Sequence, residues 1–254
     1  MNVMELYRWI DARAPFDTQL DFDNAGLLTG SPDTPITAVH FALDATDASV
    51  REAIAAGAEV LVTHHPLMFS PIQSLREDRP EAAILCLLIR HRIALISAHT
   101  NLDRAPGGIN DVLAERIGLT DIRGEDFIRV GRLPEPMSAK AFAEQVGQRL
   151  NTVVRIMGRE DRLVSSVGLC SGAGGDEWTN AGAIDAFVTG ECKHHHAMAA
   201  AAAGVTMLEC GHFATEEPGI FALADALQKD ADALQWRLRI TKSRCGGYPE
   251  GPRG

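Results

Sequence analysis

Short apolar segments alternate with amphipathic helical patterns along the whole chain, and this alternation restricts the fold more than any other feature. The segments expected to form strands are Ile36–Leu43, Glu59–Thr63, Ile93–Ser97, Phe127–Leu133, Val153–Met157, Val164–Cys170, Ala186–Thr189, Val205–Glu209 and Trp236–Ile240. Helices are expected at Met1–Asp11, Asp47–Ala56, Pro80–Arg92, Gly108–Ile117, Ser138–Leu150, Ala197–Ala203 and Pro218–Lys229. Several of the strands are apolar throughout, so they need cover on both faces of a sheet. The pattern therefore predicts an α/β fold with mixed sheets covered by helices.

A faint internal repeat indicates two related α/β lobes. Ala56-Gly57-Ala58 and Ala181-Gly182-Ala183 each precede an apolar strand, a helix and a second apolar strand that leads to a histidine, His99 or His212. A boundary near Gly124–Phe127 would give an N-terminal lobe over residues 1–125 and a C-terminal lobe over residues 126–254. Two βαβ units that resemble each other by chance remain the alternative reading of this repeat.

Composition favours a soluble cytoplasmic protein. The 254 residues include 24 Lys+Arg against 34 Asp+Glu, a net charge of −10, which argues against a nucleic-acid partner because such binding needs a basic face. No apolar run approaches the roughly 18 residues of a membrane span, and the acidic start does not look like a signal peptide. Five cysteines without a CxxC pair are typical of reduced thiols in the cytoplasm.

Histidines and acids follow three of the expected strands. They are His64 and His65 after the second strand, His99 and Asp103 after the third, and His212 and Glu216 after the eighth. Ligands bind at the carboxyl ends of strands in α/β sheets, and imidazoles with carboxylates are typical ligands of divalent metals. Five or six candidate ligands exceed the three protein ligands of a typical catalytic zinc site. The count therefore favours two ions that share a carboxylate and can generate hydroxide at neutral pH.

Each fragment also has a structural reading when it is taken alone. The His64-His65 pair could lie in an exposed turn, and residues four apart on a helix often pair for local reasons. The coincidence of three such fragments is what favours a metal site. His99 is open to two readings, as a ligand or as a residue that orients a ligand.

Two other motifs carry weaker signals. His194-His195-His196 opens an expected helix, where consecutive side chains point in different directions, so the three cannot bind one ion and a solvated helix start is favoured. The loop Cys170-Ser171-Gly172-Ala173-Gly174-Gly175 would let backbone N–H groups approach an anion. It lacks the Lys-Ser/Thr of a P-loop, so we expect a tight turn that helps to wall the pocket.

Other catalytic classes have little support. The sequence contains no Gly-x-Ser-x-Gly elbow and no Gly-x-Gly-x-x-Gly after an early strand. No cysteine stands in an obviously electropositive setting that would activate it.

At these residues the sequence resembles the NGG-interacting-factor-like family, whose bacterial members are often named GTP cyclohydrolase 1 type 2. The matching motifs are Asp23-Asn24-Ala25-Gly26-Leu27, Val62-Thr63-His64-His65-Pro66, His99-Thr100-Asn101-Leu102-Asp103, Cys170-Ser171-Gly172-Ala173-Gly174-Gly175, Val188-Thr189-Gly190-Glu191 and Gly211-His212-Phe213-Ala214-Thr215-Glu216. The resemblance implies two lobes, a dinuclear metal centre between them, and a toroidal homohexamer whose metal sites face the inner cavity. It implies metal ligands at His64, His65, Asp103, His212 and Glu216, with Glu216 shared by both ions. The regulatory-like domain that some members insert between the lobes is absent, because only a short stretch separates Asp126 from the Gly-rich loop.

The resemblance implies a metal-dependent hydrolase acting on a small molecule, such as a nucleotide. In the cyclohydrolase version, GTP and water give 7,8-dihydroneopterin triphosphate and formate, with His99 as a proton shuttle or an orienting residue. Against this reaction, no Lys/Arg cluster for a triphosphate lies beside the ligand motifs, and Arg104 is the nearest basic residue. The alternatives are a ring-shaped metal-binding assembly, storage or scaffold protein, and a metal-dependent phosphoesterase. Zinc, iron, manganese and nickel all suit these ligands.

Overall fold

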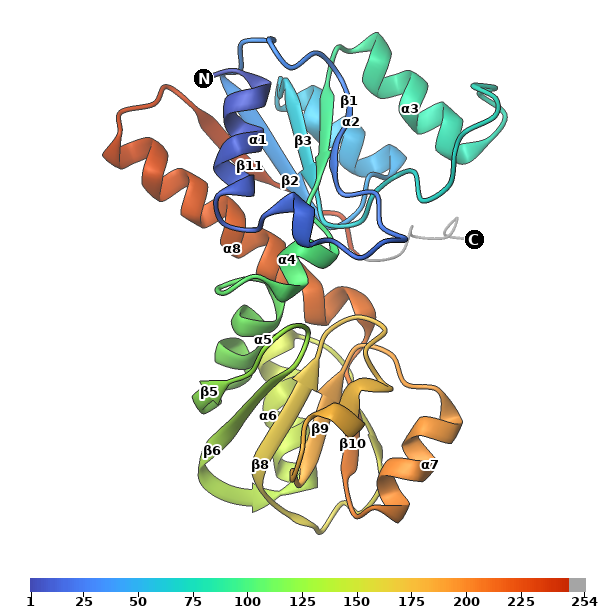
Figure 1. Cartoon of the computed structure of the whole chain (residues 1–254), viewed down its shortest axis with the longest axis vertical. Helices are drawn as coiled ribbons and strands as arrows, with labels where there is room; N and C mark the ends of the chain where they lie inside the picture. The colour runs from blue at the N-terminus through green and yellow to red at the C-terminus, as the bar shows by residue number, and fades with distance from the viewer. Residues whose placement is uncertain (247–254) are drawn as a thin grey trace. The chain divides into compact units, whose positions relative to one another are not determined.

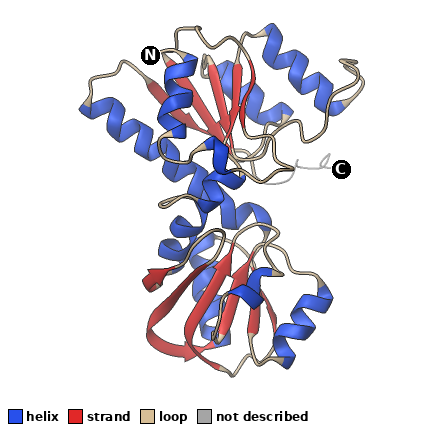
Figure 2. Ribbon diagram, viewed as in Figure 1, coloured by secondary structure: helices blue, strands red, loops and turns tan. Residues whose placement is uncertain are grey.

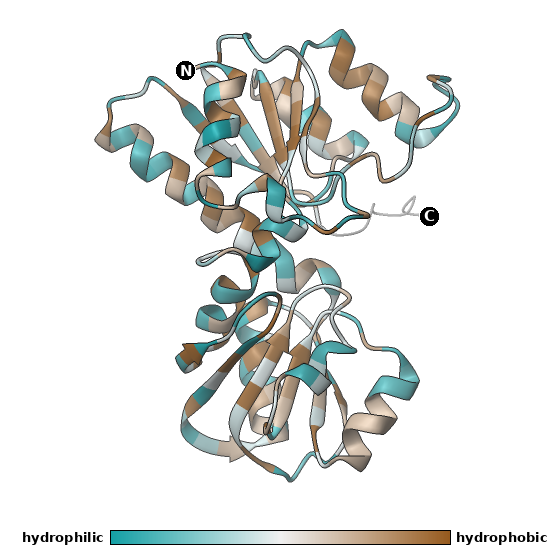
Figure 3. Ribbon diagram, in the orientation of Figure 1, coloured by the Kyte–Doolittle hydropathy of each residue, from teal (hydrophilic) through white to brown (hydrophobic). Residues whose placement is uncertain are grey.

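Two mixed β-sheets, each covered by helices, make up residues 1–246, which are the residues that the computed structural model describes (Figure 1). The strands of both sheets are mostly apolar, and helices lie against them (Figures 2 and 3). The predicted fold class, an α/β protein with helix-covered mixed sheets, is confirmed. The chain divides into two compact units, which are described in turn.

Unit 1 is built on a five-stranded sheet with the order β1-β4-β3-β2-β11. The strands are β1 (Gly26–Thr29), β2 (Ala38–Ala42), β3 (Val60–Thr63), β4 (Ala94–Ser97) and β11 (Arg239–Lys242). Strand β1 is antiparallel to β4, and the other pairs are parallel. Its helices are α1 (Val3–Asp11), α2 (Asp47–Ala55), α3 (Pro80–Arg90) and the short α4 (Thr100–Arg104), with a 3-10 turn at Phe16–Thr18. Every residue of β2, β3 and β4 is buried, as expected for parallel strands covered on both faces.

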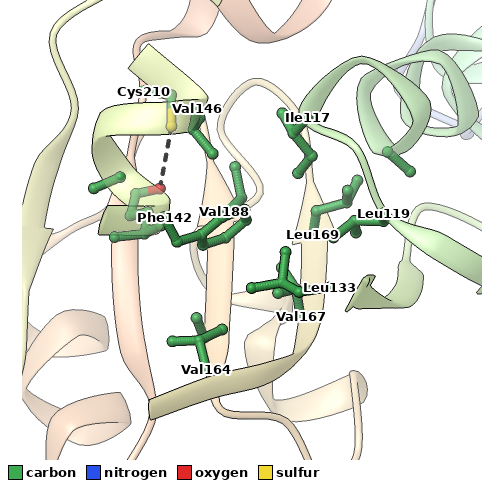
Figure 4. Close-up of a cluster of buried hydrophobic side chains, with 14 of the residues drawn as sticks. Ile117, Leu119, Leu133, Phe142, Val146, Val164, Val167, Leu169, Val188 and Cys210 are labelled. Atoms are coloured by element: carbon green, nitrogen blue, oxygen red, sulfur yellow. Dashed lines mark hydrogen bonds between the residues drawn. The ribbon is translucent and has the colours of Figure 1, made fainter. Parts of the chain in front are cut away.

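Unit 2 is built on a six-stranded sheet with the order β5-β6-β8-β9-β10-β7. The strands are β5 (Thr120–Arg123), β6 (Arg129–Ser138), β7 (Arg155–Met157), β8 (Leu163–Cys170), β9 (Ala186–Thr189) and β10 (Thr206–Glu209). Its helices are α5 (Ile109–Ile117), α6 (Ala139–Leu150), α7 (His194–Ala202) and the first part of α8 (His212–Ala233), with a 3-10 turn at Glu177–Asn180. Phe142 and Val146 of α6 and Ile117 of α5 pack on Val188 and Leu169 in one core cluster (Figure 4). A second cluster joins Ala197 and Ala200 of α7 to Phe187 and Met207 of the sheet.

The units do not coincide with the boundary expected between residues 125 and 126. Unit 1 contains Met1–Pro106 and the chain from Ile220 onward, whereas unit 2 contains Gly107–Gly219. Strand pairing explains the difference. Strand β5 pairs with β6 in the second sheet, so the chain enters unit 2 before residue 125. Strand β11 pairs in parallel with β2, so the C-terminal segment returns to the first sheet.

Local capping follows the sequence closely. The Ser138 hydroxyl accepts a hydrogen bond from the Ala141 N–H at 3.2 Å and begins α6 as its N-cap. Gly118 ends α5 with φ of 88°, in the left-handed region that glycine adopts without steric cost. Helix α8 begins at His212, six residues before the expected start, so Pro218 lies inside the helix. Among the helices of residues 1–246, none combines the length and hydropathy of a bilayer-spanning segment.

Candidate metal centre

Three of the expected ligand residues of unit 1, and His99, lie together at the carboxyl ends of two neighbouring strands. Strands β3 and β4 are parallel, with Thr63 paired to Ser97, so the residues that follow them emerge at the same edge. His64 and His65 come directly after β3, His99 precedes α4, and Asp103 lies within α4. His64 is fully buried, and the Asp103 carboxylate lies 3.5 Å from its Nε2. Unit 1 therefore holds one compact group of imidazoles with a carboxylate.

Each of the three imidazoles has an oxygen acceptor at Nδ1. The acceptor is the Ala98 carbonyl for His64 at 2.8 Å, the Asp44 carboxylate for His65 at 2.7 Å and the Asp23 carboxylate for His99 at 2.9 Å. An acceptor at Nδ1 takes the N–H of that ring nitrogen and leaves Nε2 as the atom that can face a metal. One ligand atom from each ring lies within 4.8 Å of the others. This is the arrangement typical of histidine metal ligands, which donate their other ring N–H to a carbonyl or a carboxylate.

The orienting residues Asp23 and Asp44 were not singled out by the sequence analysis. Asp44 stands 21 residues before His65, and Asp23 stands 76 residues before His99, so spacing gives no signal. Asp23 belongs to a motif that supported only the family resemblance. The one signal for Asp44 is its position just after β2, at the edge where His64 and His65 also emerge.

The Asp23 carboxylate is buried and accepts several hydrogen bonds. Besides His99, it accepts bonds from the Thr100 N–H and from the Thr100 hydroxyl. Burial alone would raise the pKa of Asp23, but these hydrogen bonds and the charge of His99 outweigh it and lower the pKa to about 2. The group is therefore ionised throughout the neutral range and holds His99 in one orientation.

Replacing Asp23 with asparagine should make the protein less stable in a pH-dependent way. The pKa of Asp23 is lowered in the folded state, so its contribution is complete above the unfolded pKa of about 4 and is lost as the pH falls towards 2. We expect Asp23→Asn to lower the free energy of unfolding by about 2 kcal/mol at pH 7. The difference from wild type should shrink as the pH falls below about 4. Urea unfolding across this range measures it.

Asp33→Asn, which changes an exposed aspartate of the same unit, is the matched control and should be nearly neutral at every pH. A destabilisation of Asp23→Asn that stayed constant down to pH 3 would contradict this account of the carboxylate.

Unit 2 holds a second, smaller ligand group at the start of α8. His212 and Glu216 stand four residues apart on the helix, and the His212 Nε2 lies 3.0 Å from the Glu216 carboxylate. The His212 Nδ1 lies 3.1 Å from the Glu191 carboxylate, so this ring also has an oxygen acceptor on one side. Glu216 is almost completely buried. The structure thus gathers the expected ligands in two groups, one on each unit.

The Gly-rich loop packs directly on the second ligand group. Gly172 has φ of 54°, and a Cβ at this position would lie 2.0 Å from the Glu216 Oε1 and 3.1 Å from the His212 Nε2. The Gly172 N–H donates to the Thr215 hydroxyl at 3.1 Å, which fixes the loop to the first turn of α8. The expected tight turn is therefore present, and it is glycine at position 172 that leaves room for the Glu216 carboxylate.

The three consecutive histidines belong to neither ligand group in residues 1–246. They form the first turn of α7, where His194 and His195 are exposed and His196 is half-buried. Consecutive positions on the helix send these side chains in different directions, as the sequence analysis expected.

The donor set of both groups consists of imidazole nitrogens and carboxylate oxygens. This combination suits zinc, iron, manganese and nickel, and it does not suit metal centres that need thiolate ligands. With their Nδ1 atoms held by oxygen acceptors, the imidazoles of unit 1 are preorganised to ligate through Nε2. The residues present therefore fit a divalent metal.

The fold and these ligand groups define a two-unit α/β protein with candidate metal ligands on both units. The family described as Duf34/NIF3 (NGG1p interacting factor 3) matches residues 1–247, and the chain belongs to this family. A GTP cyclohydrolase 1 type 2 homolog of Streptomyces coelicolor is 30% identical over 260 aligned residues, covering 96% of this chain and 91% of that protein. The family resemblance inferred from the motifs is thereby confirmed.

Solved structures agree with this assignment. A Staphylococcus aureus hypothetical protein matches with a TM-score of 0.92 and 26% identity, over 99% of both chains. A Bacillus cereus protein related to NIF3 also has a TM-score of 0.92, over 98% of both chains; at 23% identity, this match concerns the fold alone.

Proposed function

We propose that this chain is a hydrolase that depends on two divalent metal ions, and that both ligand groups serve the same pair of ions. The proposed ligands are His64, His65, Asp103, His212 and Glu216, with Glu216 shared by the two ions. The observation that carries the proposal is the set of three imidazoles of unit 1, each with an oxygen acceptor at Nδ1 and a ligand atom within 4.8 Å of the others. Histidines with a purely structural role do not need this shared arrangement.

Ligand number and charge favour one shared site. Unit 1 offers two of the proposed imidazoles, His64 and His65, and one carboxylate, Asp103, and three protein ligands suit a single ion with an open position. Two dications need more negative charge than one carboxylate provides, and Glu216 of unit 2 adds a second anion. A site with five protein ligands for two ions would keep open positions for water and substrate, as catalytic rather than structural sites do.

The chain's own residues would orient the ions and handle protons. Two divalent ions would supply a Lewis acid and lower the pKa of water at the site. Asp44 and the Ala98 carbonyl would hold His65 and His64 in the ligating orientation. Asp23 holds the Nδ1 side of His99, so the Nε2 of His99 is the atom that can accept and return a proton, or serve as a further ligand.

The preferred reaction is the hydrolytic ring opening of GTP, with formate as one product and 7,8-dihydroneopterin triphosphate as the other. Its support is the name of the Streptomyces relative, a GTP cyclohydrolase 1 type 2 homolog. The family resemblance also supports a homohexamer, and the five cysteines without a CxxC pair support a cytoplasmic location; both belong to this proposal. Static light scattering of the purified protein would test the oligomer.

Metal analysis and activity assays on matched variants test the proposal. Wild type should bind up to two ions per chain by elemental analysis and should release formate from GTP, with a panel of nucleotides and phosphodiesters run in parallel. Asp103→Ala of unit 1 and His212→Ala of unit 2 should both lower metal content and activity. The control is His91→Ala, an exposed histidine outside both ligand groups, which should change neither.

The outcomes separate the functions. If His212→Ala kept the full metal content, the idea that both units serve the same ions would be wrong. If wild type bound two ions but hydrolysed nothing in the panel, the hydrolase assignment would fail and a metal-binding assembly, storage or scaffold role would replace it. Hydrolysis of phosphodiesters without formate release would identify a phosphoesterase.

A further inference from the structure

A pocket of about 350 Å³ lies within unit 2, beside the His212–Glu216 group. Its volume is at the small end of the range of about 300 to 1,000 Å³ for small-molecule sites. Three basic side chains, Arg155, Lys193 and His196, line it together with acidic side chains. No motif in the sequence points to Arg155 or Lys193, and His196 was expected to lie in a solvated helix start.

Two of the segments that line the pocket also contact the candidate ligand group or adjoin a residue that does. Glu191 lines the pocket, and its carboxylate lies 3.1 Å from the Nδ1 of His212. Ala173 and Gly175 also line the pocket, and they follow Gly172, which packs against the Glu216 carboxylate. A molecule in this pocket would therefore lie next to the residues proposed to bind metal.

Some charged side chains of the pocket already pair with a neighbour, and others can contact a ligand. Arg155 and Glu209 form an ion pair at 2.6 Å, and Glu209 also accepts a hydrogen bond from the Cys192 N–H. Arg155 uses one terminal nitrogen in this pair, so its guanidinium has further N–H groups to offer. Lys193 and His196 are three residues apart at the start of α7, a spacing that brings side chains to the same side of a helix. Asp176 adds an exposed carboxylate.

We infer that this pocket binds a small phosphate monoester that also carries hydrogen-bond donors. Lys193, His196 and the remaining N–H groups of Arg155 match the three acceptor oxygens of a phosphate. Asp176 accepts from the donor groups of the same molecule. Burial, and secondarily the charge of Glu209, raise the pKa of the Cys192 thiol, which disfavours the nucleophilic thiolate form of this cysteine. The inference goes beyond the proposed function, because it adds a binding site for a small anion beside the candidate ligand group of unit 2.

Binding of three probes to the full-length protein tests the inference. The probes are adenosine 5′-monophosphate, which has both a phosphate and an amino group, adenosine, which lacks the phosphate, and inorganic phosphate. Isothermal titration calorimetry is done first in a chelating buffer, so that binding does not depend on metal, and then with manganese added. We expect the monophosphate to bind more tightly than either partial probe.

Single substitutions test which side chain contacts which part of the bound molecule. Lys193→Ala should weaken the monophosphate at least about tenfold, the cost of one hydrogen bond to a charged group, and should leave adenosine unchanged. Asp176→Asn should weaken the monophosphate and adenosine but not inorganic phosphate. The control is Lys140→Ala, an exposed lysine of unit 2 that does not line this pocket, and it should bind all probes as wild type does.

Unchanged binding of the monophosphate to Lys193→Ala would overturn the inference, and so would the absence of saturable binding at millimolar concentration. These results are independent of the proposed function. Asp103→Ala should lose metal content and hydrolysis but keep probe binding in the chelating buffer. Lys193→Ala should lose probe binding but keep metal content and hydrolysis.

Discussion

Replacing His64 with alanine should remove at least one of the two metal ions that the chain is proposed to bind. His64 is fully buried, its Nδ1 donates to the Ala98 carbonyl, and its Nε2 faces the Asp103 carboxylate at 3.5 Å. Loss of an outer partner of a ligand typically costs about 10- to 100-fold in metal affinity, so loss of the ligand itself should cost more. We expect elemental analysis after dialysis to find at most one ion per chain in His64→Ala.

Substitution of a buried histidine also affects stability, so a matched control is needed. His40 lies on β2 of the same sheet, is equally buried, and contacts Thr241 at 2.8 Å rather than a member of the ligand group. His40→Ala should lower the free energy of unfolding but leave the metal content at the wild-type value. Equal metal content in wild type and His64→Ala would contradict the proposed centre.

Replacing Gly172 with alanine should damage both stability and metal binding. A Cβ at Gly172 would lie 2.0 Å from the Glu216 Oε1, so either the carboxylate or the loop must move. Overpacking of this kind typically costs about 1–3 kcal/mol, in addition to about 1 kcal/mol for a non-glycine residue at positive φ. The displaced carboxylate should also lower the metal affinity. Urea unfolding and metal titration measure the two effects.

Gly182→Ala separates the steric effect from the conformational one. Gly182 has φ of 72°, and a Cβ there would meet nothing within 4 Å. This variant should therefore show only the backbone cost of about 1 kcal/mol and should keep wild-type metal affinity. If Gly172→Ala behaved like Gly182→Ala in both measurements, the loop would have no role in positioning Glu216.

The sequence predicted the interior of the fold better than its edges. The continuous apolar runs at Val60–Thr63 and Ala186–Thr189 are central strands, and they were expected because burial on both faces selects apolar residues at every position. The edge strand β5 reads Thr-Asp-Ile-Arg and is mostly exposed, so it has no apolar pattern to detect. Strand β1 is also at an edge and was not expected. Periodicity reports burial, and edge strands are only partly buried.

The ligand side chains were predictable, but the residues that orient them were not. Histidines and acids after apolar strands are visible because the carboxyl ends of parallel strands share an edge. The partners of those histidines depend on which loops meet at that edge, and Asp23 and Asp44 arrive there from distant parts of the chain. In the same way, Pro218 suggested the start of a helix, whereas α8 already begins at His212.

The place of β11 in the first sheet affects how the chain folds during its synthesis. Unit 2 is continuous in sequence, so all of its strands have been made once residue 219 leaves the ribosome. The sheet of unit 1 is complete only once residues 239–242 have been made, and until then the buried and mostly apolar strand β2 is an open sheet edge. Open edges of this kind pair with other chains. A protein shortened before residue 239 should therefore aggregate through β2, even though every proposed metal ligand is still present.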